Sequence, residues 1–181
     1  MLYTAARRTA RHDAAGNYVP LERQDTSLWE RPLIALAEQL LHQASAAGPS
    51  GRYQIVAAIQ SAHVARRLTG VANWAAVVAL YNHLFALTGS PVVILNRAVA
   101  RAELDGPGAA LADLSSLETD RRMIAYQPYW AARGHLLALA GDTASAAQAL
   151  TVAIGLTTDE AVNTYLRQRL AALQGGARTR T

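Results

Sequence analysis

The chain has 181 residues, 51% hydrophobic and 17% charged, which is enough apolar side chain for one sizeable core or a short array of stacked units. It contains no cysteine, which excludes a disulfide framework, a thiolate nucleophile and a cysteine-based zinc site. All 17 basic residues are arginine, and five of them lie in the two tails, leaving 12 against 13 acids elsewhere. The net charge of +4 is therefore mostly a property of the ends and does not by itself indicate nucleic-acid binding.

The absence of cysteine is compatible with a reducing compartment, so we expect a cytoplasmic protein, and the hydropathy pattern predicts no membrane contact. No stretch approaches the roughly 18 consecutive apolar residues of a membrane span, and a polar sequence, not an apolar one, follows Arg7 and Arg8. A single phenylalanine and abundant alanine favour closely packed helices over a sheet of β-branched and aromatic residues. We therefore expect an all-α fold.

From Met1 to about Gln24 the sequence is mixed and polar, and it predicts a turn followed by a short extended piece. After it, apolar spacing, N-cap residues, first-turn prolines and closing glycines predict helices in regular succession, about eight in all with short connections. Ser50 is expected to cap the second helix and Thr158 the last. The expected helices cover about 32–47, 52–68, 73–89, 91–105, 107–117, 128–140, 143–156 and 159–173.

The later helices share a repeated sequence pattern. Trp130 is followed four residues on by Gly134, and then by Gly141, Ala146 and Ala153, in the spacing of a tetratricopeptide unit. Small residues allow paired helices to approach closely, and the aromatic residue fills the gap between them. The pattern predicts a tetratricopeptide-like α-α superhelix, with a plain helical bundle as the alternative.

The preceding helix carries the repeat more weakly, with packing residues expected at Trp74, Val77, Tyr81 and Leu84. The distance from Trp74 to Gly108 equals the 34-residue tetratricopeptide period. We expect four parts: 1–24 as a linker or the end of a preceding helical region, 25–70 as a helical pair packed on the repeats, 71–174 as the repeats, and 175–181 as a disordered tail.

No residue motif in the sequence predicts catalysis, a metal site or a cofactor site. None of the five histidines lies four residues from another, and no Ser-His-Asp arrangement or phosphate-binding loop is indicated. His63 shares a helical face with Val56 and Ile59 and is expected to point toward the core or a groove. We therefore expect a protein that is not an enzyme.

Polar or amphipathic groups on otherwise apolar helices are the candidate partner contacts, although buried groups that cap neighbouring helices would give the same pattern. These candidates are Tyr53, Gln54, His63, Asn96 and Arg97. Asn96 stands where tetratricopeptide units that clamp a peptide carboxylate carry an asparagine, but the chain lacks the lysines of a full clamp.

A second hypothesis is a small-molecule sensor with a pocket lined by Trp74, Tyr81 and His63. A third is direct nucleic-acid binding through the arginine tails.

Several stretches together resemble one family. They are "ARRTARHDAAGNYVPLERQDTSLWERPLI", "RYQIVAAIQSAHVA", "NWAAVVALYNHLFALTGSPVVILNRAVARAELDGPGAAL" and "LTTDEAVNTYLRQRLAAL". From about Ala5 to Leu173 the chain resembles the C-terminal half of extracytoplasmic-function (ECF) RNA polymerase sigma factors that carry a tetratricopeptide extension.

The resemblance implies a regulatory or protein-interaction domain. In such sigma factors, two N-terminal helical modules recognise promoter DNA and bind polymerase, and neither has room in this sequence. The expected partners are the sigma core modules, RNA polymerase, or a signalling partner or metabolite, with DNA contacted only through the missing modules. The family assigns no catalytic residues to the extension.

Overall fold

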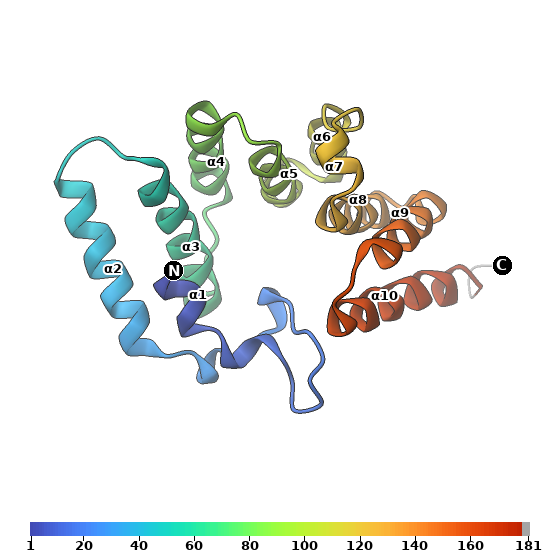
Figure 1. Ribbon diagram of the computed structural model, residues 1–181, viewed down its shortest axis with the longest axis horizontal. Coiled ribbons are helices and arrows are strands. Elements are labelled where there is room, and N and C mark those ends of the chain that lie inside the picture. The colour runs from blue at the N-terminus through green and yellow to red at the C-terminus, as the bar shows by residue number, and fades with distance from the viewer. Residues whose placement is uncertain (179–181) are drawn as a thin grey trace. The chain divides into compact units, whose positions relative to one another are not determined.

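The computed structural model describes residues 1–178, with side chains to residue 175. This part of the chain forms ten α-helices, eight of them with nine or more residues, and one isolated antiparallel bridge between His12 and Tyr18. The expectations of an all-α fold and about eight main helices are confirmed. The chain divides into two compact units, Met1–Gly89 and Ser90–Thr181, which are described separately (Figure 1).

The first unit contains α1 (Leu2–Ala6), α2 (Arg31–Ala46), α3 (Arg52–Thr69) and α4 (Trp74–Thr88). Helix α1 packs on α2 and α3, and α4 packs on α3 (Figure 1). Between α1 and α2 the chain forms three single turns of 3-10 helix. Gly89 ends α4 in the left-handed conformation, at φ 58°, which a residue without a Cβ adopts at little cost.

The core of the first unit depends on residues outside the three long helices. Tyr3, Ala6 and Ala10 are buried beside Trp29, which is 3% exposed. The backbone N–H of Glu30 donates to the carbonyl of Ala6 at 2.9 Å and ties the start of α2 to α1. The segment 1–24, expected as a linker or the end of a preceding helical region, therefore contributes apolar side chains to the core of this unit.

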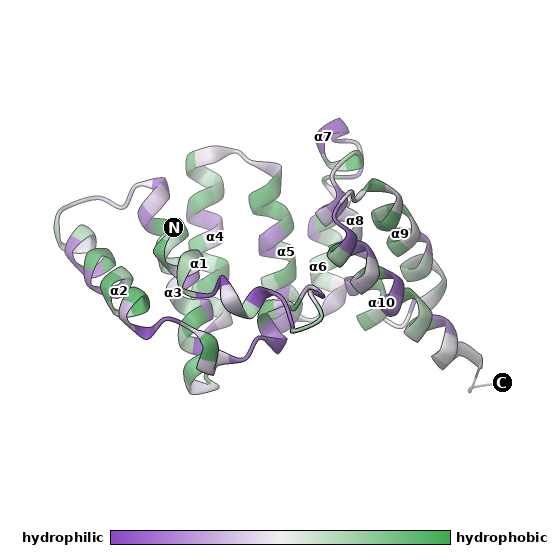
Figure 2. Ribbon diagram, turned by 60° about the horizontal axis from the view of Figure 1, so that its bottom comes forward, coloured by the Kyte–Doolittle hydropathy of each residue, from purple (hydrophilic) through white to green (hydrophobic). Residues whose placement is uncertain are grey.

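The second unit contains α5 (Pro91–Asp105), α6 (Pro107–Ser115), α7 (Arg121–Ile124), α8 (Gln127–Leu139), α9 (Thr143–Leu156) and α10 (Glu160–Arg178). Neighbouring helices pack in the pairs α5–α6, α8–α9 and α9–α10, and α6 also contacts α8. Figure 2 shows α5 as a mostly hydrophobic ribbon interrupted by hydrophilic bands. Its apolar side contributes Leu95 and Ala98 to a core shared with α6 and α8.

Small residues set the contact between α8 and α9, as the repeat spacing predicts. Ala146 and Ala153 are fully buried at 0% exposed. A Cβ on Gly134 would lie 2.9 Å from Cγ of Leu150 and 3.2 Å from the carbonyl oxygen of Ala146. Only a residue without a side chain fits this approach.

Two helix starts differ from expectation. Gly51, not Ser50, is the N-cap of α3, and the Gln54 Oε1 accepts from the Gly51 N–H at 2.6 Å. At α10, Asp159 takes the capping role expected of Thr158, because its Oδ1 accepts from the Ala161 N–H at 2.9 Å. A carboxylate on the first-turn N–H groups also benefits from the helix dipole.

The boundaries of the parts also differ from expectation. Helix α4, expected among the repeats, belongs to the unit Met1–Gly89 and packs on α3. The expected disordered tail, 175–181, is helical as far as Arg178, where α10 ends. Residues 179–181 lie outside the described part of the chain.

Candidate functional site

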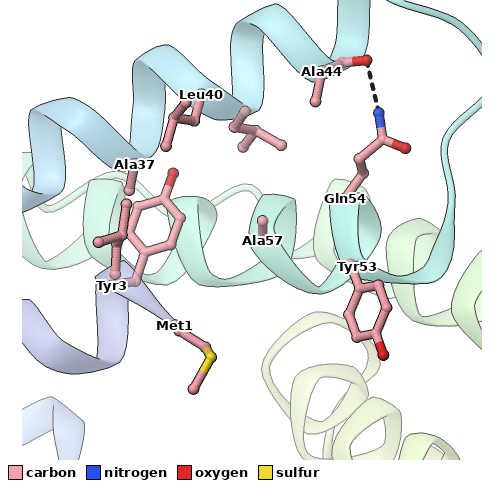
Figure 3. Close-up of a pocket in the computed structure, with 10 residues that line it drawn as sticks. Met1, Tyr3, Ala37, Leu40, Ala44, Tyr53, Gln54 and Ala57 are labelled. Carbon is pink, nitrogen blue, oxygen red and sulfur yellow. Dashed lines mark hydrogen bonds between the residues drawn. The ribbon is translucent and has the colours of Figure 1, made fainter.

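A pocket of about 230 Å³ lies among α1, α2 and α3 in the first unit. Figure 3 shows Tyr3 toward one end, Gln54 toward the other, and Leu40 and Ala57 between them. The full set of lining residues is Met1, Leu2, Tyr3, Ala37, Leu40, Leu41, Ala44, Tyr53, Gln54 and Ala57. The pocket thus brings together two of the candidate residues from the sequence, Tyr53 and Gln54.

Gln54 holds the end of α2 against the start of α3. Its side-chain amide N–H donates to the Ala44 carbonyl at 2.7 Å while its Oε1 accepts from the Gly51 N–H. Both ends of the amide are therefore used within the protein. Gln54 therefore matches the alternative interpretation of the sequence, in which a polar side chain caps neighbouring helices.

Tyr53 is 74% exposed at the rim of the pocket. The Arg52 guanidinium carbon lies 4.5 Å from the centre of its ring, and Arg52 Nη2 donates to its hydroxyl at 2.5 Å. Tyr53 and Arg52 therefore present an apolar surface and a cation side by side.

His63 lies on α3 and contacts Trp74 at the start of α4. The two rings meet edge to face, with centres 6.1 Å apart, and the Arg66 guanidinium carbon lies 4.9 Å from the Trp74 ring centre. Burial lowers the pKa of His63, and the charges of Arg66 and Arg7 lower it further, against an opposing effect of Glu22. His63 is thus a half-buried packing residue that is favoured in its neutral form.

Arginines tie the irregular segments of the first unit to α3. Arg7 Nη2 donates to the Gln60 Oε1 at 2.6 Å, and Arg67 Nη2 donates to the Gln24 carbonyl at 2.9 Å. Arg66 lies 3.6 Å from the Glu22 carboxylate. The pair Arg66–Arg67, which reads as solvated charge in the sequence, is instead half-buried at structural contacts.

Tyr81 is buried on α4 with Val77 and Leu84, as the expected packing positions require. Burial raises its pKa to about 12. The pocket described above contains neither Tyr81, Trp74 nor His63. The sequence-based grouping of these three as pocket walls therefore does not match it.

Asn96 and Arg97 occupy different environments on α5. Asn96 is exposed, whereas the Arg97 Nε donates to the Asp113 Oδ2 on α6 at 3.0 Å. Arg101 Nη1 donates to the Asp113 Oδ1 at 2.7 Å, and the Asp113 side chain is only 11% exposed. Two arginines on successive turns of α5 thus share one carboxylate, which ties α5 to α6.

Sequence reasoning missed Asp113 and the walls that α1 and α2 contribute to the pocket. The spacing of Arg97 and Arg101, four residues apart on α5, was a signal for a shared acidic partner. The α2 wall carried a weaker signal, since Ala37, Leu41 and Ala44 recur at helical spacing. Nothing in the sequence indicated that α1 forms a wall of the same pocket.

Among the described residues, no group of three or more histidine, cysteine, aspartate or glutamate side chains is arranged to hold a metal ion. In the same part of the chain, no helix combines the length and apolar character needed to cross a membrane.

Comparison with known proteins gives two matches. Residues 1–45 match the model of a family of unknown function, DUF6596. An uncharacterized protein of Rhizobium meliloti (strain 1021) is 39% identical over 170 residues, which cover 94% of this chain and 40% of that protein. The chain thus spans about 40% of the length of this curated relative. No solved structure gives a significant match.

Proposed function

We propose that this chain is a regulatory, protein-interaction domain of an ECF-type RNA polymerase sigma factor, without enzymatic activity and working in the cytoplasm. The resemblance from about Ala5 to Leu173 carries this proposal. The extent of the match to the Rhizobium protein supports it, because a sequence that aligns almost completely with 40% of a longer chain fits one part of a larger protein. The proposed partners are the sigma core modules or RNA polymerase, with promoter DNA bound by those modules.

The arrangement of the second unit supports an interaction role. Its helices pack in pairs around a core of leucines, alanines, Met123 and Tyr129, with Gly134 also buried, so the outer faces of the helices are free to differ from one pair to the next. On α5, Asn96 is exposed beside the Arg97–Asp113 contact that fixes the helix. Asn96 is therefore the polar group of α5 that we assign to partner recognition, while Arg97 maintains the α5–α6 pair.

Binding of the full chain to purified sigma core modules and to core polymerase tests this proposal. Biolayer interferometry should detect binding to at least one of them. Asn96→Ala should weaken it several-fold, while Gln148→Ala, an exposed amide on α9, should leave it unchanged. A gel shift with promoter DNA should show no sequence-specific complex. Absence of binding to both partners, or a specific DNA complex, would contradict the proposal.

A further inference from the structure

The pocket in the first unit has the form of a compact ligand site. Its walls come from three helices, and Figure 3 shows Tyr3 and Gln54 toward opposite ends. The hydrogen bonds of Gln54 to Ala44 and Gly51 fix α2 against α3, so two walls are held in place without a ligand. A pocket of this small volume suits a small molecule better than the side of an extended helix.

The lining determines the main part of the ligand. Apart from Tyr3, Tyr53 and Gln54, the lining side chains are aliphatic or methionine, with alanines at positions 37, 44 and 57. An apolar cavity of about 150 Å³ in another protein is large enough for benzene. The 230 Å³ here therefore suits an apolar ring or chain of about six to ten carbon atoms.

A cation lies next to one of the lining residues. The Arg52 guanidinium lies against Tyr53, which is a lining residue, and Arg52 is exposed. Among the side chains that the structure describes, no carboxylate lies within ion-pair distance of Arg52. An anionic group on a ligand could therefore pair with Arg52 while the rest of the molecule enters the pocket.

We propose that the pocket among α1, α2 and α3 binds a small amphipathic carboxylate, with its chain or ring between Ala37 and Ala57 and its carboxylate at Arg52. This site does not depend on the proposed role in transcription. Because the ligand would contact α1 as well as α2 and α3, its binding stabilises the attachment of α1 to the unit.

Titration of the full ¹⁵N-labelled chain with sodium octanoate, and separately with 1-octanol, tests this site. The two probes share an eight-carbon chain but only octanoate carries a negative charge. With both probes, amide resonances of residues 37–44 and 53–57 should shift. Shifts confined to other regions would overturn the proposal, as would the absence of any shift at millimolar octanoate.

Variants separate the apolar and the charged contributions. Arg52→Gln should weaken octanoate about two- to fivefold, the range for an exposed ion pair, and leave 1-octanol unchanged. Arg8→Gln, which removes an exposed arginine elsewhere in the unit, should change neither affinity. If Arg52→Gln leaves octanoate affinity intact, or weakens both probes equally, the carboxylate site is wrong.

Filling the pocket gives an independent test. Ala57→Leu should weaken both probes at least tenfold, whereas Ala79→Leu, at an exposed position on α4, should leave them unchanged. Circular dichroism and urea unfolding establish that each variant is folded. Ala44→Leu serves as the second pocket-filling variant if Ala57→Leu is unfolded. Undiminished binding in a folded filled variant would place the probes elsewhere and overturn the proposal.

Discussion

In the unit Ser90–Thr181 successive helices approach closely at small residues, whereas the unit Met1–Gly89 relies on aromatic residues from outside its three long helices. Gly134 and Ala146 bring α8 and α9 together, and the same kind of contact recurs at Ala110 in α6. In the first unit, Tyr3 and Trp29 fill the core from outside the long helices.

The two kinds of packing respond to change in different ways. A close contact between two helices fails when a side chain is added, because neither backbone can move far without losing its neighbours. A core filled by a large aromatic residue fails when that side chain is removed, because a cavity remains. The comparison therefore predicts opposite sensitivities in the two units.

The largest effect is expected for Trp29→Ala. Loss of this 3% exposed side chain should lower the free energy of unfolding by about 3–5 kcal/mol. Hydrogen exchange should show lost protection in α1, α2 and α3. The control is Leu28→Ala, since Leu28 is 51% exposed and its loss should cost no more than about 0.5 kcal/mol. Equal effects of the two variants would refute the assignment of Trp29 to the core.

Gly134→Val is expected to come next. The added side chain meets Leu150 and the Ala146 carbonyl, so urea unfolding should show a loss of about 1–3 kcal/mol. The same substitution at Gly155, on α9, meets nothing within 4 Å of the new Cβ and should be nearly neutral. If Gly134→Val is also neutral, α8 and α9 do not pack closely there.

The smallest effect is the pH dependence that His63 contributes. Its folded pKa is lowered by burial and by Arg66 and Arg7, so the folded state favours neutral histidine. The unfolded chain then binds more protons as the pH falls below about 6.5, and the free energy of unfolding decreases. His63→Gln should reduce this decrease in urea unfolding between pH 7.5 and 5.5. His83→Gln, at an exposed position on α4, should retain it.

The two units also differ in how far the sequence alone predicts them. The helix at 143–156 is found at Thr143–Leu156, and the small residues expected between α8 and α9 are buried where the spacing places them. Helix α1 lies in the segment expected as a linker or the end of a preceding helical region. The short helix α7 was not expected, because four residues are too few for apolar periodicity to be recognised. The local sequence pattern is sufficient to predict the structure where each helix packs mainly on the next helix in the sequence.

The candidate site was predicted only in part. Tyr53 and Gln54 do line the pocket, but the sequence does not distinguish exposed Tyr53 from Gln54, whose amide oxygen and nitrogen both make hydrogen bonds within the protein. Asn96 and Arg97 are adjacent in the sequence, yet Arg97 pairs with Asp113, sixteen residues away. Such partners depend on which helix faces meet, and this is not encoded by any one stretch.

The sequence by itself determined the all-α class, the main helices and the positions where helices approach closely, because these follow from propensity, caps and short-range periodicity. Only the tertiary structure decided that Tyr3 and Trp29 share a core and that α1 contributes a wall to the pocket. It also decided that Arg97 holds two helices together. These contacts join segments far apart in sequence, and their free energy comes from burial and charge pairing that exist only once the chain has folded.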